Sequence, residues 1–341
     1  MCRHVLPFTG RLTRGKPSLI PFFGPAALGV ALAAKPSTEL AASWIAAQCA
    51  RPSGAITVRP GGSEVSGYFG SLTADALARS GTRPEVVLAW MSWYVAHAHD
   101  SGSGVDGVAD DVELRDGTEL SRGRPDSTDA YGALFMTLAR DAYDSGDPTL
   151  RAFVLEHRAG LTRIAESSIA TLQPIGLTWA SPQHRVFYAI DNAQVVRGMR
   201  DAAVLMRTAY ADTTAAQRYD AIAARVDDAM RTRLWDARTQ TFRPYLTARD
   251  EPPGANLGFL YPDALAQLFA IYDGIVPNDG TAQSLAVRAS RAVLSQADPM
   301  SEAHLLLLVV QRRLGIREPL PPFTAPALCA DAAWYISAAR S

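Results

Sequence analysis

Apolar side chains recur every third or fourth residue along most of this sequence, in blocks that end at turn-forming residues. This spacing is typical of amphipathic α-helices, and breaks such as Lys35-Pro36-Ser37 and Ser80-Gly81-Thr82 separate one helix from the next. About twelve helices are expected from these blocks. They span residues 19–34, 38–50, 66–80, 84–99, 127–145, 148–172, 191–211, 214–234, 262–273, 281–296, 300–314 and 327–339.

The connections between these helices favour hairpins arranged in a ring. Short links alternate with long polar loops, as expected when paired helices follow one another around a centre. Strand-forming residues occur mainly in the loops, where residues 178–188 and 241–246 predict short ribbons. We therefore expect an all-α fold, an (α/α)6 toroid of six hairpins with short β-ribbons in its loops. An open α-solenoid is the alternative. The long loops are residues 51–65, 100–125, 174–190 and 237–260.

The N-terminal region decides the predicted domain limits and location. Residues 1–18 are predicted to be disordered, and residues 19–341 to form a single catalytic domain. Residues 19–34 resemble a signal peptide, but Pro21 and Pro25 interrupt the apolar run. We interpret this run as the first helix, which favours a cytoplasmic location over secretion. No apolar run reaches the roughly 18–20 residues that a membrane span requires.

Charge and composition narrow the possible partners. The 33 basic and 34 acidic residues nearly cancel, so no basic field is available for a nucleic acid or a membrane surface. A neutral partner and a monomeric state are expected.

The three cysteines are odd in number and far apart, which predicts neither a metal site nor a disulfide framework. We expect no metal and no other cofactor.

Four long loops each end in a helix start that carries an acid and an aromatic residue. In a ring of hairpins these starts would converge on one central cavity. A helix start needs only one cap, so a second acid beside an aromatic side chain indicates a binding function. A capping box followed by core residues is the alternative. The four starts contribute Glu64 and Tyr68; Asp126, Asp129 and Tyr131; Tyr188, Asp191 and Asn192; and Tyr261, Asp263 and Gln267.

Carboxylates, amides and aromatic rings together suit a carbohydrate. Hydroxyl groups need hydrogen-bond partners, and the apolar face of a sugar ring stacks on Trp or Tyr. Trp93 and Trp179 are therefore further candidates for substrate binding, and Asp111 is an acid that could reach the same cavity.

These motifs resemble the six-hairpin glycosidase superfamily, whose members are (α/α)6 toroids that act on carbohydrates. A more distant likeness is to glycoside hydrolase family eight. The proton donor of that family lies in a motif that Ser63-Glu64-Val-Ser-Gly67-Tyr68 resembles. Its substrate-binding acid lies in a run similar to Asp126-Ser-Thr-Asp129-Ala-Tyr131. Its base lies in a motif that Tyr261-Pro262-Asp263-Ala264 matches only with Pro262 inserted.

The resemblance implies a glycoside hydrolase acting on a poly- or oligosaccharide. Glu64 would be the general acid, kept protonated by burial near Tyr68. Asp263 or Asp191 would activate water, and Asp126 and Asp129 would hold the sugar. Two alternatives remain: another sugar enzyme of the helical toroids, a polysaccharide lyase or an epimerase with a His or Tyr base, and a carbohydrate-binding scaffold without catalysis.

Overall fold

The computed structural model describes residues 37–98, 105–123, 125–247, 249 and 254–341. The expected disorder of residues 1–18 and the helix expected over residues 19–34 lie outside the described residues. Residues Ser37–Ser341 form one compact unit. No described helix is long and apolar enough to cross a membrane.

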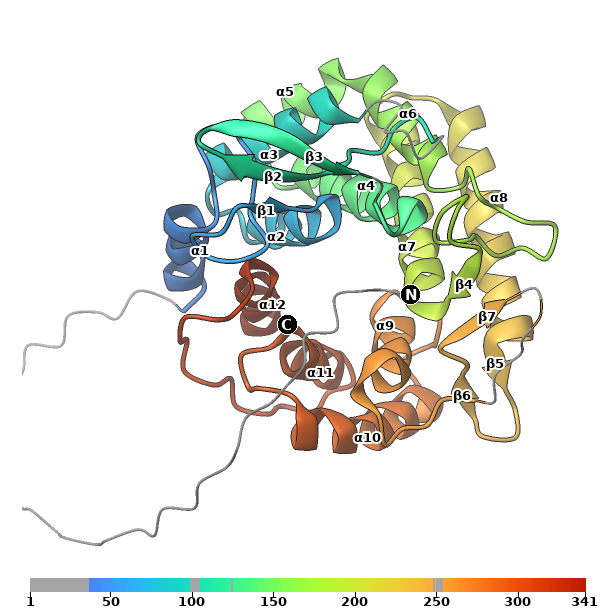
Figure 1. Ribbon diagram of the computed structural model, residues 1–341. Coiled ribbons are helices and arrows are strands. Elements are labelled where there is room, and N and C mark those ends of the chain that lie inside the picture. The colour runs from blue at the N-terminus through green and yellow to red at the C-terminus, as the bar shows by residue number, and fades with distance from the viewer. Residues whose placement is uncertain (1–36, 99–104, 124, 248, 250–253) are drawn as a thin grey trace, which may run out of the picture. The chain divides into compact units, whose positions relative to one another are not determined.

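Six inner helices close a ring in this unit (Figure 1). Each inner helix packs against the next in chain order, and the last returns to the first. The expected all-α (α/α)6 toroid is therefore confirmed. The inner helices are α2 (Gly67–Ser80), α4 (Thr128–Asp144), α7 (Ala189–Thr208), α9 (Leu265–Tyr272), α11 (Glu302–Arg313) and α12 (Cys329–Arg340).

The outer layer supports the inner helices and departs from the prediction in one place. The helix expected over residues 148–172 is two helices, which meet at His157. Residues 315–328 contain four prolines, and no helix is formed there, between α11 and α12. The outer helices are α1 (Ser37–Gln48), α3 (Pro84–His97), α5 (Pro148–Glu156), α6 (Arg158–Ser167), α8 (Thr213–Ala229) and α10 (Gly280–Gln296).

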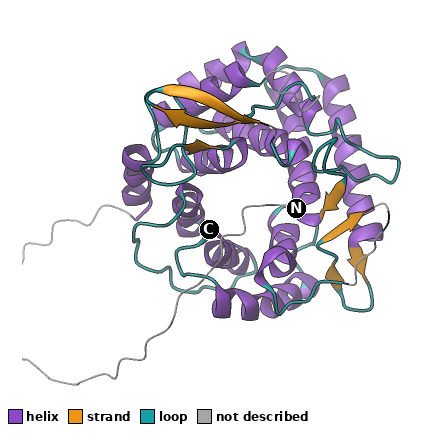
Figure 2. Cartoon of the chain, viewed as in Figure 1, coloured by secondary structure: helices purple, strands orange, loops and turns teal. Residues whose placement is uncertain are grey.

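Small antiparallel sheets lie in the loops (Figure 2). Strands β2 (Asp111–Arg115) and β3 (Thr118–Gly123) form a hairpin, which β1 (Glu64–Val65) joins. The prediction of a polar loop for this region is wrong, because Asp116 and Gly117 both adopt the positive φ of a tight hairpin turn. The other pairs are β4 (Val186–Tyr188) with β7 (Tyr245–Thr247), and β5 (Trp235–Asp236) with β6 (Thr241–Phe242). Two π-helical turns, η1 (Met230–Leu234) and η2 (Leu260–Ala264), complete the elements.

A network of charges joins the inner helices beyond their first turns. The Arg197 guanidinium lies 3.5 Å from Asp273, 3.7 Å from Asp201, and 3.9 Å from both Asp75 and Asp141. These groups come from α2, α4 and α7 and from the residue after α9. Arginine suits such a position because its planar group can serve several carboxylates at once.

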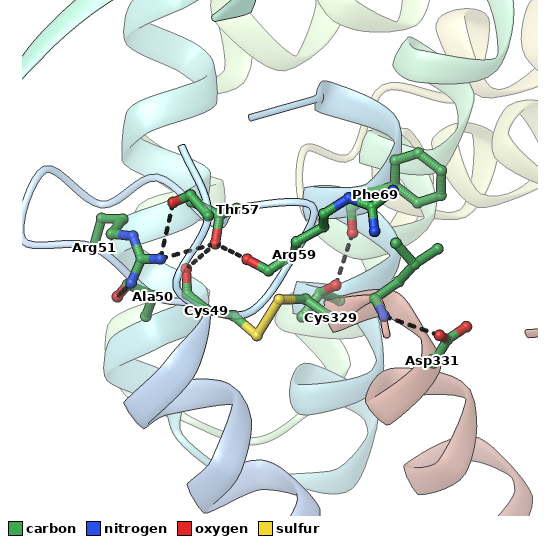
Figure 3. The surroundings of a disulfide bond; sticks show 11 residues. Cys49, Ala50, Arg51, Thr57, Arg59, Phe69, Cys329 and Asp331 are labelled. Carbon is green, nitrogen blue, oxygen red and sulfur yellow. Dashed lines mark hydrogen bonds between the residues drawn. A yellow bond between two sulfur atoms is a disulfide. The ribbon is translucent and has the colours of Figure 1, made fainter. Parts of the chain in front are cut away.

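A disulfide between Cys49 and Cys329 corrects the expectation that the cysteines form no disulfide (Figure 3). The two residues are 280 positions apart, and the closing of the ring brings the end of α1 beside the start of α12. The same seam contains a hydrogen bond from the Cys329 amide to the Val58 carbonyl. Sequence spacing cannot reveal this pair, because its proximity depends on the whole toroid.

Candidate functional site

The starts of the inner helices bring acids from distant segments together. Helices α4 and α7 pack so closely that no side chain would fit at Gly198, where a Cβ atom would lie 2.5 Å from the Ala133 carbonyl oxygen. This close packing allows the acids of the two helices to meet. Asp129 in the first turn of α4 and Asp191 in the first turn of α7 are thereby neighbours. The predicted convergence of these two helix starts is present in the structure.

Ser127 links these two acids. Its hydroxyl oxygen lies 2.8 Å from Asp129 Oδ1 and 3.1 Å from Asp191 Oδ2. A hydroxyl group has only one hydrogen to donate, so a second hydrogen bond requires a proton on one of the two carboxyl groups. Burial raises the pKa of both acids, and the charge of Asp129 adds to the rise at Asp191. The pair is therefore arranged to hold a proton.

Asp129 is the better acceptor of the two. It is fully buried, and the Ala130 amide and the Thr178 hydroxyl donate to its oxygens at 2.8 and 2.7 Å. Asn192 fixes Thr178 in turn, because its amide oxygen accepts the Thr178 N–H at 2.9 Å. Asp191 is half-buried, and Ser127 is its partner in this cluster. Asp191 is thus the acid best placed to carry the shared proton.

Tyr131 connects a second pair of acids. Its hydroxyl lies 3.2 Å from Asp111 Oδ1 and 3.4 Å from Asp126 Oδ1, and 2.9 Å from the Ser66 hydroxyl. Asp126 is exposed, whereas Asp111 is half-buried. Burial raises the pKa of Asp111 to about 7, and the carboxylate of Asp126 adds to this effect. An exposed acid, Asp126, therefore lies beside a half-buried acid whose pKa is raised.

Glu64 lies at the edge of this cluster, in β1. The pairing of β1 with β2 places it across from Glu113, two residues from Asp111. The Arg122 guanidinium from β3 lies 2.9 Å from its carboxylate, and 30% of the Glu64 side chain is exposed. This ion pair ties Glu64 to the β2–β3 hairpin.

Tyr68 faces the cluster from α2. The Gln194 side chain donates to its hydroxyl at 2.7 Å. Burial has the largest effect on Tyr68 and raises the pKa of its phenol. The nearby carboxylate of Glu302 raises this pKa further, and that of Asp191 adds a smaller rise. Helices α7 and α11 flank α9, which lies across the ring from α2, so Asp191 and Glu302 approach Tyr68 from two sides. Burial also raises the pKa of Glu302 to about 7.

The fourth predicted helix start lies at the rim. The Tyr261 side chain is 48% exposed. Asp263 is half-buried, and its carboxyl group accepts a hydrogen bond from the backbone N–H of Asn256 at 2.7 Å. Burial raises the pKa of Asp263. This start contributes an exposed aromatic ring and a tethered acid.

Three predicted binding residues have other surroundings. Trp93 is buried on the outer helix α3, where its indole N–H donates to Glu119 at 2.8 Å. The Gln267 amide is buried and exchanges two hydrogen bonds with the Phe242 backbone. The Trp179 ring is covered by the Arg185 guanidinium, 5.0 Å from its centre.

Tyr188 has a histidine partner that the sequence did not indicate. Its hydroxyl lies 2.9 Å from His184 Nε2. Burial lowers the pKa of His184, and the Asp126 carboxylate opposes this effect. The His184–Tyr188 pair therefore lies near the acids.

Several residues of the site were missed at the sequence level. Glu302 begins α11 directly after Ser301, but no Trp, Tyr or Phe stands near it and only a short link precedes it, so it has half of the signal that the four predicted helix starts carry. Ser66, Thr178 and Gln194 carry no such signal, because their roles depend on contacts across the ring. The described residues include no group of three or more His, Cys, Asp or Glu that could hold a metal ion.

Comparison with known proteins gives the fold a context. No family model matches the sequence, and no curated protein matches it. A solved glycosidase shares 13% identity over 89% of this chain and 95% of its own, with a TM-score of 0.63. A variant glycosidase in complex with glucose gives 14% identity over the same shares and a TM-score of 0.62. A rhamnosidase from Klebsiella oxytoca with rhamnose bound shares 13% identity over 80% of this chain and 56% of its own, with a TM-score of 0.53.

The chain has the fold of the six-hairpin glycosidases. The predicted resemblance to that superfamily is confirmed at the level of the fold. The more distant likeness to family eight stays a prediction.

Proposed function

We propose that this protein is a glycoside hydrolase that cleaves a poly- or oligosaccharide with carboxyl groups as acid and base. The observation that carries the proposal is the Ser127 hydroxyl shared by Asp129 and Asp191, next to the exposed Asp126. Hydrolysis of a glycosidic bond needs one protonated carboxyl group and one carboxylate. Asp191 and Asp126 are our candidates for these two roles.

The surroundings of each acid suggest its role. Asp191 donates its proton to the oxygen of the leaving sugar while the bond between that oxygen and the anomeric carbon breaks. Asp126 accepts the proton of the water molecule that adds to the anomeric carbon. Asp129 orients Asp191 through Ser127, and the Tyr131 hydroxyl and Asp111 bind sugar hydroxyl groups. We assign the proton donor to Asp191 rather than to Glu64 because the Glu64 carboxylate is bound by Arg122, whereas Asp191 shares the Ser127 hydroxyl with a second acid.

One observation supports a second candidate, a polysaccharide lyase. The His184–Tyr188 pair could supply the base that such an enzyme needs, and a lowered pKa of His184 favours the neutral imidazole. A lyase forms an unsaturated product, which absorbs in the ultraviolet, whereas a hydrolase does not.

The disulfide bears on the location. Disulfides persist in oxidising compartments and are rare in the cytoplasm. The Cys49–Cys329 bond therefore supports secretion, the alternative to the expected cytoplasmic location.

The test is a screen of the purified protein against a panel of neutral, acidic and amino-sugar polysaccharides. We expect new reducing ends from at least one of them, without ultraviolet absorbance. Asp191→Asn should reduce the rate by about 10²–10⁴-fold, the usual contribution of a general acid. The matched control is Asp144→Asn, at an exposed position on α4, which should keep full activity. Absence of cleavage across the panel would favour the scaffold alternative.

A further inference from the structure

A hollow lies at the outer helix α10, next to the segment that leads into α9. Among the exposed large apolar side chains of the described residues, two are aromatic, Phe259 at 58% and Tyr261 at 48% exposure. Both lie in the short segment between β7 and α9. Tyr261 lies in η2, which runs directly into α9, and the flanking helices α7 and α11 carry Asp191 and Glu302 in their first turns, so this segment ends beside the candidate active site.

The hollow is lined in part by residues 255–258, which directly precede Phe259 in the sequence. It has a volume of about 530 Å³ and lies between residues 255–258 and helix α10. Polar side chains from three segments line it: Asn256 from the loop, Thr239 from the turn after β5, and Arg288, Arg291 and Ser295 from α10. Hydroxyl groups of a sugar could pair with each of these groups, and no carboxylate is among the lining residues.

The loop that forms this hollow is held in place from both sides. The Asn256 amide donates to Asp263 at 2.7 Å, and the Gln296 side chain donates to the Gly258 carbonyl at 2.7 Å. Arg288 is fixed by the carbonyls of Thr239 and Gln240. A site whose walls are ordered before binding loses less conformational entropy when a ligand arrives.

We propose that Phe259, Tyr261 and this hollow form a distal subsite for a neutral sugar chain that extends beyond the cleaved bond. This inference rests on the proposed function and makes it more specific: the substrate is a chain several sugars long rather than a disaccharide. The Tyr261 and Phe259 rings stack on successive sugars. The hydrogen-bonding groups of the hollow hold the sugar beyond them.

The test separates binding from cleavage by using the Asp191→Asn variant of the full chain. Its affinity is measured by calorimetry for disaccharides and hexasaccharides of the glucan, xylan and chitin series. We expect at least one hexasaccharide to bind about tenfold more tightly than its disaccharide, which corresponds to about 1.4 kcal/mol. Adding Phe259→Ala should remove this gain and leave the disaccharide affinity unchanged. The matched control is Leu294→Ala, an apolar residue on α10 that is 64% exposed and does not line the hollow.

Each outcome has a distinct meaning. A length preference that survives Phe259→Ala, or none in any series, overturns the distal subsite. If the wild-type protein then still cleaves a polysaccharide, the proposed function stands without it. Length-dependent binding that Phe259→Ala abolishes, with no cleavage by the wild type, supports the subsite and contradicts the hydrolase.

Discussion

Ser127 stands at a capping position, but its side chain has a different role. It occupies the N-cap position of α4, yet its side chain makes no capping hydrogen bond. Its hydroxyl contacts the carboxyl groups of Asp129 and Asp191 instead. The capping alternative considered for this motif therefore does not describe Ser127, and the hydroxyl is available to hold a proton between two acids.

Replacing Ser127 with Ala should affect activity far more than stability. Loss of the bridging hydroxyl leaves Asp191 without its orienting partner, so we expect kcat/KM to fall by about 10–100-fold and the alkaline limb of the pH–rate profile to shift. The melting temperature should change little, because no cap is lost.

Asp147→Ala provides the opposite pattern as a control. Asp147 is a true N-cap, which accepts the amides of Thr149 and Leu150 at the start of α5. Its removal should cost about 1 kcal/mol of stability and leave the rate unchanged. Equal effects of Ser127→Ala and Asp147→Ala on stability, with no effect on activity, would return Ser127 to a capping role.

At the scale of elements, the disulfide joins the first and last described helices. It closes a loop of 280 residues in sequence, and the entropy of so long a loop in the unfolded chain is large. The bond also lies beside the first turn of α12, where Asp331 accepts the amide of Glu302 at 2.7 Å. Helix α12 therefore connects the disulfide with the start of α11, which carries Glu302 of the candidate site.

Removing the bond should destabilise the protein without abolishing the fold. For the double variant Cys49→Ser with Cys329→Ser we expect a loss of up to about 5 kcal/mol in the free energy of unfolding, measured by urea denaturation. A reducing agent should lower the stability of the wild type similarly and leave the double variant unchanged. Titration of free thiols at both cysteines in the native wild type would contradict the bond.

The helices could be predicted far better than the links between them. The period of apolar residues located ten of the twelve described helices to within a few residues, and it joined the other two, α5 and α6, into one. The β2–β3 hairpin was missed because the Asp116-Gly117 signal stood within a charged stretch. Four acid-bearing starts were recognised, but partners such as Thr178 for Asp129 and Ser127 for Asp191 lie on other segments, and only the folded ring brings them together.

At the scale of the whole molecule, the ring gathers carboxyl groups that repel one another and are hidden from water. Burial raises the pKa of Asp111 and Glu302 to about 7, from values near 4 in an unfolded chain. Between these values the folded protein binds more protons than the unfolded one. The stability that these protonated groups contribute should be fully present near pH 4. It should be lost progressively as the pH rises through about 7.

The most direct test of this arrangement is the melting temperature at pH 5.5 and pH 8 for the wild type and for Asp111→Asn. If the helix starts bring these acids into one desolvated site, the wild type should be several degrees more stable at pH 5.5. Asp111→Asn should show a smaller difference and be the more stable protein at pH 8. A wild-type melting temperature that does not change with pH, or an identical dependence in the variant, would contradict the gathering of these acids.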